Sequence, residues 1–144
     1  MGRRKVMDIL QAAAADLGAE IKHECGGLIV IIYEQVGYFL HIDERRRIFC
    51  LYHAVKGANG EELTESEFDT VLDYLVRGYY PDCSGLRSDG YSFVCSPWYR
   101  VVSDRKELSG NLLGNIIDRF MKMWYCACSK AYLLTDKAVS GNNK

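Results

Sequence analysis

The chain has 144 residues and a mass of 16.4 kDa, a length that suits one domain. Hydrophobic residues make up 49% and charged residues 26%, a globular composition that argues against disorder of the whole chain. The formal net charge of -1, from 18 basic and 19 acidic residues, disfavours a generic polyanion-binding protein.

The N-terminal segment does not have the pattern of a secretory signal, because Asp8, Gln11 and Asp16 interrupt its apolar residues. The longest apolar run covers residues 28–33, far fewer than the roughly 20 residues that span a bilayer. We therefore expect a cytoplasmic protein without a membrane segment. Because thiols are mostly reduced in that compartment, the six cysteines predict no disulfide framework.

The first third of the chain predicts a helix followed by an antiparallel meander. Apolar residues recur at helical spacing over residues 4–17, and Gly18 suits the left-handed position that ends a helix. From Ala19 to Val55 the apolar period changes to two, which predicts about four strands. Gly26-Gly27 is typical of a hairpin turn between the first two.

The turn at residues 44–46 decides how the last two meander strands face each other. A tight turn pairs Leu40 with Cys50, Ile42 with Ile48 and Asp43 with Arg47. One face then carries Tyr38, Leu40, Ile42, Ile48, Cys50 and Tyr52, and the other carries Phe39, His41, Phe49 and Leu51. Neither face is polar, as a face in water would be. We therefore expect a helix, another subunit or a bound segment to cover the second face.

The second helix has the clearest start in the sequence. Thr64 and Glu67 form a capping box, and Leu63 and Phe68 fit a hydrophobic staple. Pro81 stops this helix. Residues 82–90 predict an irregular segment with a turn at residues 89–90, and residues 91–95 and 98–102 predict two further strands.

A third helix is predicted from near Asp104 to about Leu133, with Glu107 completing an Asp-x-x-Glu cap. Gly110 and Gly114 lie inside it, where each costs about 1 kcal/mol relative to Ala. A packing reason is therefore expected, either close contact of the helix with the sheet or close approach of a partner helix.

These elements predict an α+β two-layer fold, in which three helices pack on an antiparallel meander sheet plus a strand pair. The expected order is helix, three or four strands, helix, two strands, helix. We expect a single domain over residues 1–134 and a flexible C-terminal tail over residues 135–144.

Few residues point to catalysis or metal binding. His23 and Cys25 would share one face of a strand, but zinc needs about four ligands and no second spaced pair exists. Nucleophilic motifs such as Gly-x-Ser-x-Gly are missing. We expect no catalytic residue, no metal and no cofactor. Two alternatives stay open, a small thiol- or metal-dependent enzyme using His23 and Cys25, and weak nucleic-acid binding through the basic tip Arg45–Arg47.

The element order over roughly residues 4–133 resembles that of type III secretion chaperones and of the similar YbjN-like bacterial proteins. The resemblance rests on element order alone, so it assigns no functional residue, and those chaperones are more acidic than this chain. It implies a small, non-enzymatic cytosolic protein, often dimeric, that binds another polypeptide.

The leading hypothesis is therefore a protein-binding module or chaperone-like adaptor. Its partner would be another protein or peptide segment, captured on apolar and aromatic sheet surface, and a homodimer is possible. The candidate contact residues are Phe39, Phe49, Leu51, Tyr91, Phe93 and Trp98.

Overall fold

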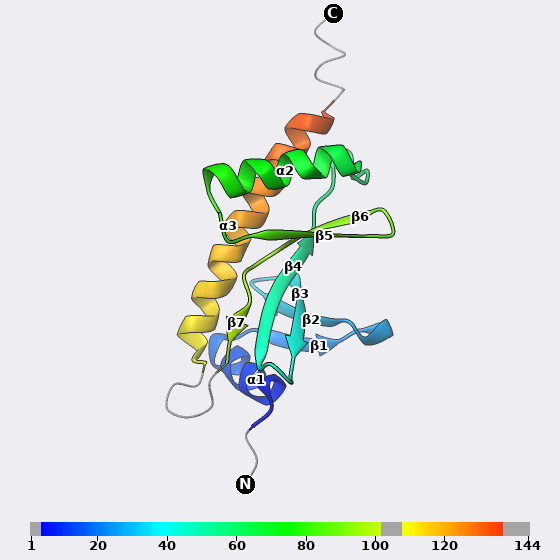
Figure 1. The fold of residues 1–144 in the computed structure, drawn as a ribbon. Helices are drawn as coiled ribbons and strands as arrows, with labels where there is room; N and C mark the ends of the chain where they lie inside the picture. The colour runs from blue at the N-terminus through cyan, green and yellow to red at the C-terminus, as the bar shows by residue number, and fades with distance from the viewer. Residues whose placement is uncertain (1–3, 102–107, 137–144) are drawn as a thin grey trace, which may run out of the picture. The chain divides into compact units, whose positions relative to one another are not determined.

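The computed structural model of the chain describes residues 4–101 and 108–136. Within these residues it contains three helices and an open antiparallel sheet of seven strands, which confirms the predicted α+β fold (Figure 1). The helices are α1 Val6–Leu17, α2 Glu65–Gly78 and α3 Gly110–Thr135. The strands are β1 Glu20–His23, β2 Ile29–Tyr33, β3 Val36–Asp43, β4 Ile48–Ala54, β5 Ser84–Ser88, β6 Tyr91–Cys95 and β7 Tyr99–Arg100.

Neighbouring strands follow the order β1-β2-β3-β4-β6-β5, and β7 pairs with β4. The chain divides into two compact units: unit 1 comprises Met1–Tyr52 and Pro97–Phe120, and unit 2 comprises His53–Ser96 and Met121–Lys144. Both β4 and α3 run from one unit into the other. A single domain over residues 1–134 stays a prediction. None of the helices in the described part of the chain is long and apolar enough to cross a lipid bilayer.

In unit 1, the start of α1 is fixed by a carboxylate from the loop after β3. The Val6 N–H donates to Oε1 of Glu44 at 2.9 Å, and the Met7 N–H donates to Oε2 at 3.1 Å. This negative group satisfies two N–H groups that a helix start leaves open and lies at the positive end of the helix dipole. Gly18 ends the helix at φ 81°, as predicted.

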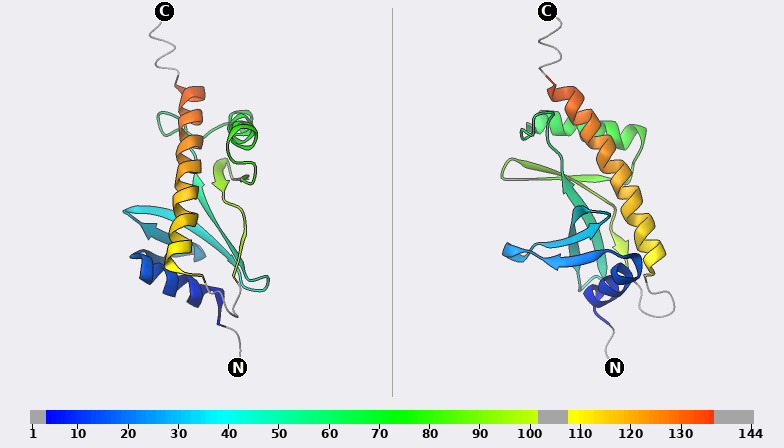
Figure 2. Two further views of the ribbon diagram at one scale, coloured as in Figure 1. Left: turned by 90° about the vertical axis from the view of Figure 1, so that its left-hand side faces the viewer. Right: turned by 180° about the vertical axis from the view of Figure 1, so that it is seen from behind.

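The two glycines of α3 mark close packing against α1, within unit 1 (Figure 2). A Cβ added to Gly110 would lie 2.9 Å from the Cβ of Asp16 and 3.2 Å from the carbonyl oxygen of Ala13. A Cβ added to Gly114 would lie 2.9 Å from a terminal methyl of Leu17. The contact is helix on helix inside one chain, an arrangement that the sequence did not distinguish from packing on the sheet or on a partner.

The pairing of β3 with β4 differs by one residue from the predicted register, which is wrong. Leu40, Ile42 and Asp43 lie opposite Leu51, Phe49 and Ile48, not opposite Cys50, Ile48 and Arg47. The loop is one residue longer than a tight turn because Arg47 adopts the left-handed conformation, with φ 57°. A one-residue shift turns each side chain of one strand to the other face relative to its partner strand. The faces of β4 are therefore exchanged relative to the prediction.

In unit 2, the predicted start of α2 is confirmed. The Glu67 N–H donates to Oγ1 of Thr64 at 3.1 Å, and the Thr64 N–H donates to Oε1 of Glu67 at 2.9 Å. The capping box therefore satisfies two backbone donors at once. Leu63 and Phe68 are both buried, as a hydrophobic staple requires.

Residues 84–88 form strand β5, so the predicted irregular segment over 82–90 is wrong there. β5 pairs with β6 through a two-residue turn at Asp89 and Gly90, whose φ values of 53° and 83° are those of a type I′ turn. Its sequence, Ser-Gly-Leu-Arg-Ser, has a single large apolar residue and so lacks the period-two signal. Contact with α2 holds it instead, since a Cβ at Gly85 would lie 2.9 Å from the Phe68 ring.

The third helix begins at Gly110, later than predicted, with the Ser109 hydroxyl accepting from the Leu112 N–H at 3.1 Å. The predicted cap, Asp104 and Glu107, lies outside the described residues. β7 covers Tyr99–Arg100 rather than the predicted residues 98–102.

In unit 2, the second half of α3 packs against the end of β4. Nε1 of Trp124 donates to the carbonyl oxygen of Ala54 at 2.9 Å, and the Trp124 ring stacks on His53 with 4.1 Å between centroids. The helix ends at Thr135, whose hydroxyl accepts from the Ala58 N–H at 2.8 Å. Residues 137–144 of the expected tail lie outside the described residues.

Candidate functional site

Four aromatic side chains of unit 1 lie on the same face of the sheet. Phe39 and Tyr52 are direct cross-strand partners on β3 and β4, and their rings stack with 5.1 Å between centroids. Trp98, just before β7, meets the exposed His41 ring edge-on at 5.2 Å. Trp98 is 48% exposed. We name Phe39, His41, Tyr52 and Trp98 the aromatic face.

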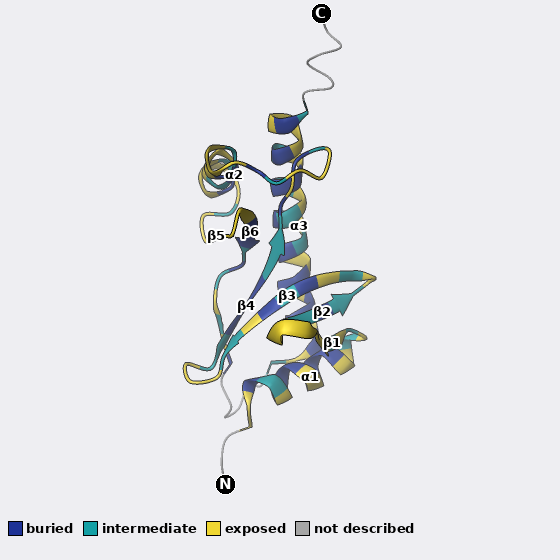
Figure 3. Ribbon diagram, turned by 90° about the vertical axis from the view of Figure 1, so that its right-hand side faces the viewer, coloured by how far each residue is buried: buried dark blue, intermediate teal, exposed yellow. Residues whose placement is uncertain are grey.

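The alternation of strand side chains separates this face from the core of unit 1 (Figure 3). The other side of β3 and β4 carries Tyr38, Leu40 and Phe49, which are buried. The Tyr38 ring contacts the Phe120 ring of α3 at 5.7 Å between centroids. The aromatic face is therefore the side of these two strands turned away from that helix contact.

The structure separates the six predicted contact residues into three groups. Phe39 and Trp98 lie on the aromatic face of unit 1. Phe49 and Leu51 are 0% exposed, because the register shift turns them into the core, where no partner reaches them. Tyr91 and Phe93 lie in unit 2, on the face of the β5–β6 hairpin that also carries Leu86.

The predicted contact set did not include three residues that share a face with its members in the structure, namely His41, Tyr52 and Leu86. Tyr52 shares a face with Phe39 only in the observed register, so its position depended on the turn at Arg47. His41 was predicted on the face of Phe39 but was not included among the contact residues. Leu86, 47% exposed, lies on a strand that the sequence did not predict.

The structure places His23 and Cys25 on different elements. His23 ends β1, whereas Cys25 opens η1, a single 3₁₀ turn over Cys25–Gly27, so the expectation that both share a strand face is wrong. Both are exposed. Within residues 4–101 and 108–136, no group of three or more His, Cys, Asp or Glu side chains is placed to hold a metal ion.

All six cysteines are free thiols. Burial raises the pKa of Cys83 to about 11, with a smaller contribution from the Asp82 carboxylate, and burial alone raises the pKa of Cys128 to about 11. Burial also raises the pKa of Cys95. A thiol with a raised pKa stays protonated at neutral pH and is a poor nucleophile, so these three positions do not have the environment of a catalytic cysteine.

The basic tip at residues 45–47 is a hairpin loop. Arg45 and Arg46 are exposed, and the Arg46 N–H donates to Oδ1 of Asp43 at 3.0 Å. Arg47 is half-buried, and its carbonyl oxygen accepts from the Val101 N–H at 2.9 Å. Two exposed guanidinium groups at a loop make a small basic patch, narrower than the charged face of a nucleic-acid binder.

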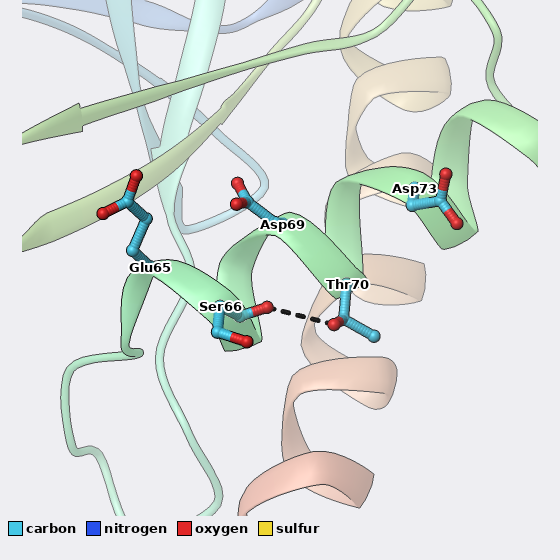
Figure 4. Close-up of a pocket in the computed structure, with 5 residues that line it drawn as sticks. All are labelled: Glu65, Ser66, Asp69, Thr70 and Asp73. Atoms are coloured by element: carbon cyan, nitrogen blue, oxygen red, sulfur yellow. Dashed lines mark hydrogen bonds between the residues drawn. The ribbon is translucent and has the colours of Figure 1, made fainter.

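An exposed row of carboxylates runs along α2 in unit 2 and lines a shallow, wide-open depression (Figure 4). Glu65, Asp69 and Asp73 are spaced four residues apart and therefore lie on one side of the helix. Asp73 forms an ion pair with Arg77 at 2.8 Å. We name Glu65, Asp69 and Asp73 the acidic row.

No protein-family model matches the chain, and a comparison with curated proteins finds no relative. The fold class therefore rests on the structure, and function has to be argued from its surfaces.

Proposed function

We propose that this protein is a non-enzymatic protein-binding module, a chaperone-like adaptor that captures a segment of a partner polypeptide on the aromatic face. The observation that carries the proposal is Trp98, a tryptophan that is 48% exposed and lies edge-on to His41 beside the stacked pair Phe39 and Tyr52. Tryptophan and tyrosine are enriched among the residues that dominate binding energy at protein interfaces.

The proposed mode of capture follows from the shape and charge of this face. Aromatic rings at strand positions offer a rigid surface that loses little conformational entropy on binding. With a net charge of -1, the chain supplies little long-range attraction. The partner is therefore an extended or amphipathic segment that contributes apolar side chains. A second copy of the chain is the other occupant to test.

The proposal includes a cytoplasmic location. Six free thiols suit a reducing compartment, because an oxidising one tends to pair cysteines as disulfides. Metal content measured on the purified protein separates the adaptor from the thiol- or metal-dependent alternative, since stoichiometric zinc or iron would contradict a purely protein-binding role.

The direct experiment is quantitative affinity capture from a native lysate with the wild-type chain, Trp98→Ala and Leu133→Ala as bait. Leu133 is 78% exposed on α3, so its variant controls for loss of an exposed apolar side chain outside the aromatic face. The proposal expects at least one protein whose capture falls with Trp98→Ala and not with Leu133→Ala. Equal capture by all three baits would contradict it.

A further inference from the structure

The outer edge of β5 is a free strand edge in unit 2. β5 is the last strand in the sheet order and pairs on one side with β6. Within the described residues, no strand pairs with its other side. The type I′ turn at Asp89 and Gly90 makes Ser88 and Tyr91 a hydrogen-bonded pair, so the N–H and C=O groups of Gly85 and Arg87 point away from β6.

This edge lacks the features by which proteins block unwanted strand pairing. β5 contains no proline and no lysine, and its one charged side chain is turned inward: Nη1 of Arg87 donates to the Leu63 carbonyl oxygen at 2.9 Å and to Oγ of Ser92 at 2.7 Å. By contrast β1, at the opposite end of the strand order, carries exposed Glu20 and Lys22. The edge of β5 is therefore suited to accept another strand.

The acidic row of α2 lies on the side of the helix next to this edge. Leu72 and Phe68 face Gly85 of β5. Since successive helical residues turn by about 100°, Asp69 lies about 60° around the helix from Leu72. Tyr74, which contacts Lys130 of α3, lies about 160° around in the other direction. The acidic row is thus on the side of β5 that faces away from α3, and Figures 1 and 2 show α2 running alongside β5.

The spacing of the acidic row matches that of alternate residues on a strand. Carboxylates four residues apart on a helix are separated by about 6 Å along its axis. Side chains two residues apart on a strand are separated by about 6.7 Å. A strand added to β5 with a basic residue at every second position would therefore place successive positive charges beside Glu65 and Asp69 and, at the end of the row, beside Asp73, whose carboxylate also pairs with Arg77.

We infer that the edge of β5 and the acidic row of α2 form a binding site for an extended basic peptide segment. Its backbone pairs with Gly85 and Arg87, and its alternate Lys or Arg side chains face the carboxylates. Strand addition supplies affinity through main-chain hydrogen bonds, and alternate side chains supply specificity. A second copy of this chain fits poorly, because it would bring its own acidic row to the same seam. The inference is independent of the aromatic face, which belongs to unit 1.

The test uses two short fluorescent peptides that alternate Lys with Thr and have equal length and charge, one with an ordinary backbone and one N-methylated at every Lys. Because the Lys residues lie opposite Gly85 and Arg87, their N–H groups face β5, so only the first peptide can donate to its edge. Fluorescence anisotropy is measured with the wild-type chain, Asp69→Asn, Asp69→Lys and, as a matched control, Asp118→Lys, which reverses an exposed carboxylate of α3. Amide hydrogen exchange of Gly85 and Arg87 is followed with and without peptide.

The inference expects the unmodified Lys-Thr peptide to bind and to slow exchange at Gly85 and Arg87. Asp69→Lys weakens this binding by about fivefold to tenfold, Asp69→Asn weakens it less, and Asp118→Lys leaves it unchanged. Three results would overturn the inference: no binding of the unmodified Lys-Thr peptide, equal binding of its N-methylated form, or equal weakening by Asp69→Lys and Asp118→Lys. Asp69→Asn, which removes the charge at nearly constant size, keeps the test valid if Asp69→Lys disturbs α2.

Discussion

The ring of Phe39 stacks on the ring of Tyr52, its direct partner across β3 and β4, with 5.1 Å between the ring centroids. The pair exists only because the loop before β4 contains one residue more than a tight turn. Without that residue, Phe39 would share its face with Phe49 and Leu51, which are buried in the structure. The identity of the proposed binding surface therefore depends on the strand register.

The stacked pair predicts energetic coupling between Phe39 and Tyr52. In a double-mutant cycle of Phe39→Ala and Tyr52→Ala, we expect a coupling energy of about 0.5–1.5 kcal/mol, because stacked aromatic rings interact beyond their burial. Urea unfolding of the four proteins measures it. If the losses of unfolding free energy in the two single variants sum to the loss in the double variant within about 0.3 kcal/mol, the rings do not interact. That result would contradict the observed register of β3 and β4.

The two glycines of α3 predict unequal responses to alanine. Gly110→Ala lowers the free energy of unfolding by about 1–3 kcal/mol, since its Cβ meets the Ala13 carbonyl oxygen and the Asp16 Cβ. Gly114→Ala meets a flexible terminal methyl of Leu17 and gains about 1 kcal/mol of helix propensity, so its net change stays within about 1 kcal/mol. Thermal unfolding compares the stability of the two variants. A larger loss of stability for Gly114→Ala than for Gly110→Ala would contradict the packing of α3 on α1.

The buried thiols predict selective alkylation. With iodoacetamide at pH 8, we expect the exposed Cys25 to react first and Cys83 and Cys128 to react slowly, because both are buried and have a pKa of about 11. Peptide mapping by mass spectrometry identifies the modified positions. If Cys128 were alkylated as fast as Cys25 in the folded protein, that would contradict the burial of Cys128.

The same thiols predict a loss of stability in alkali. A folded-state pKa of about 11, above the ordinary value of 9.0, means that the unfolded chain releases these protons first as the pH rises. The free energy of unfolding should therefore fall as pH increases through the window from about 9 to about 11. Cys128→Ala should flatten this dependence in urea unfolding measured across that window, and an unchanged slope would argue against a raised pKa at Cys128.

The sequence predicted the features that depend on local chemistry. The Thr64–Glu67 capping box and the turn at Asp89 and Gly90 need only neighbouring residues, and both are confirmed. The register of β3 and β4 could not be predicted, because left-handed backbone at Arg47, a residue type that rarely adopts it, supplies the extra loop position.

Strand β5 was missed for a different reason. Its residues are small or polar, and it is held by contacts with distant residues: Gly85 against Leu72 and Phe68, and Arg87 on the Leu63 carbonyl oxygen. Such tertiary contacts override local propensity. Neither proposed site could therefore be fully predicted from the sequence. The aromatic face depends on the observed register of β3 and β4, and the peptide-binding edge belongs to β5, which the sequence did not predict.

The most direct test of the proposed function is the affinity of the captured partner segment for the aromatic face. Isothermal titration calorimetry with the wild-type chain, Trp98→Ala and the control Leu133→Ala measures it. The proposal predicts a Kd raised by about tenfold or more in Trp98→Ala, as for an aromatic residue at the centre of an interface, and unchanged in Leu133→Ala. An equal Kd for all three proteins would contradict capture on the aromatic face.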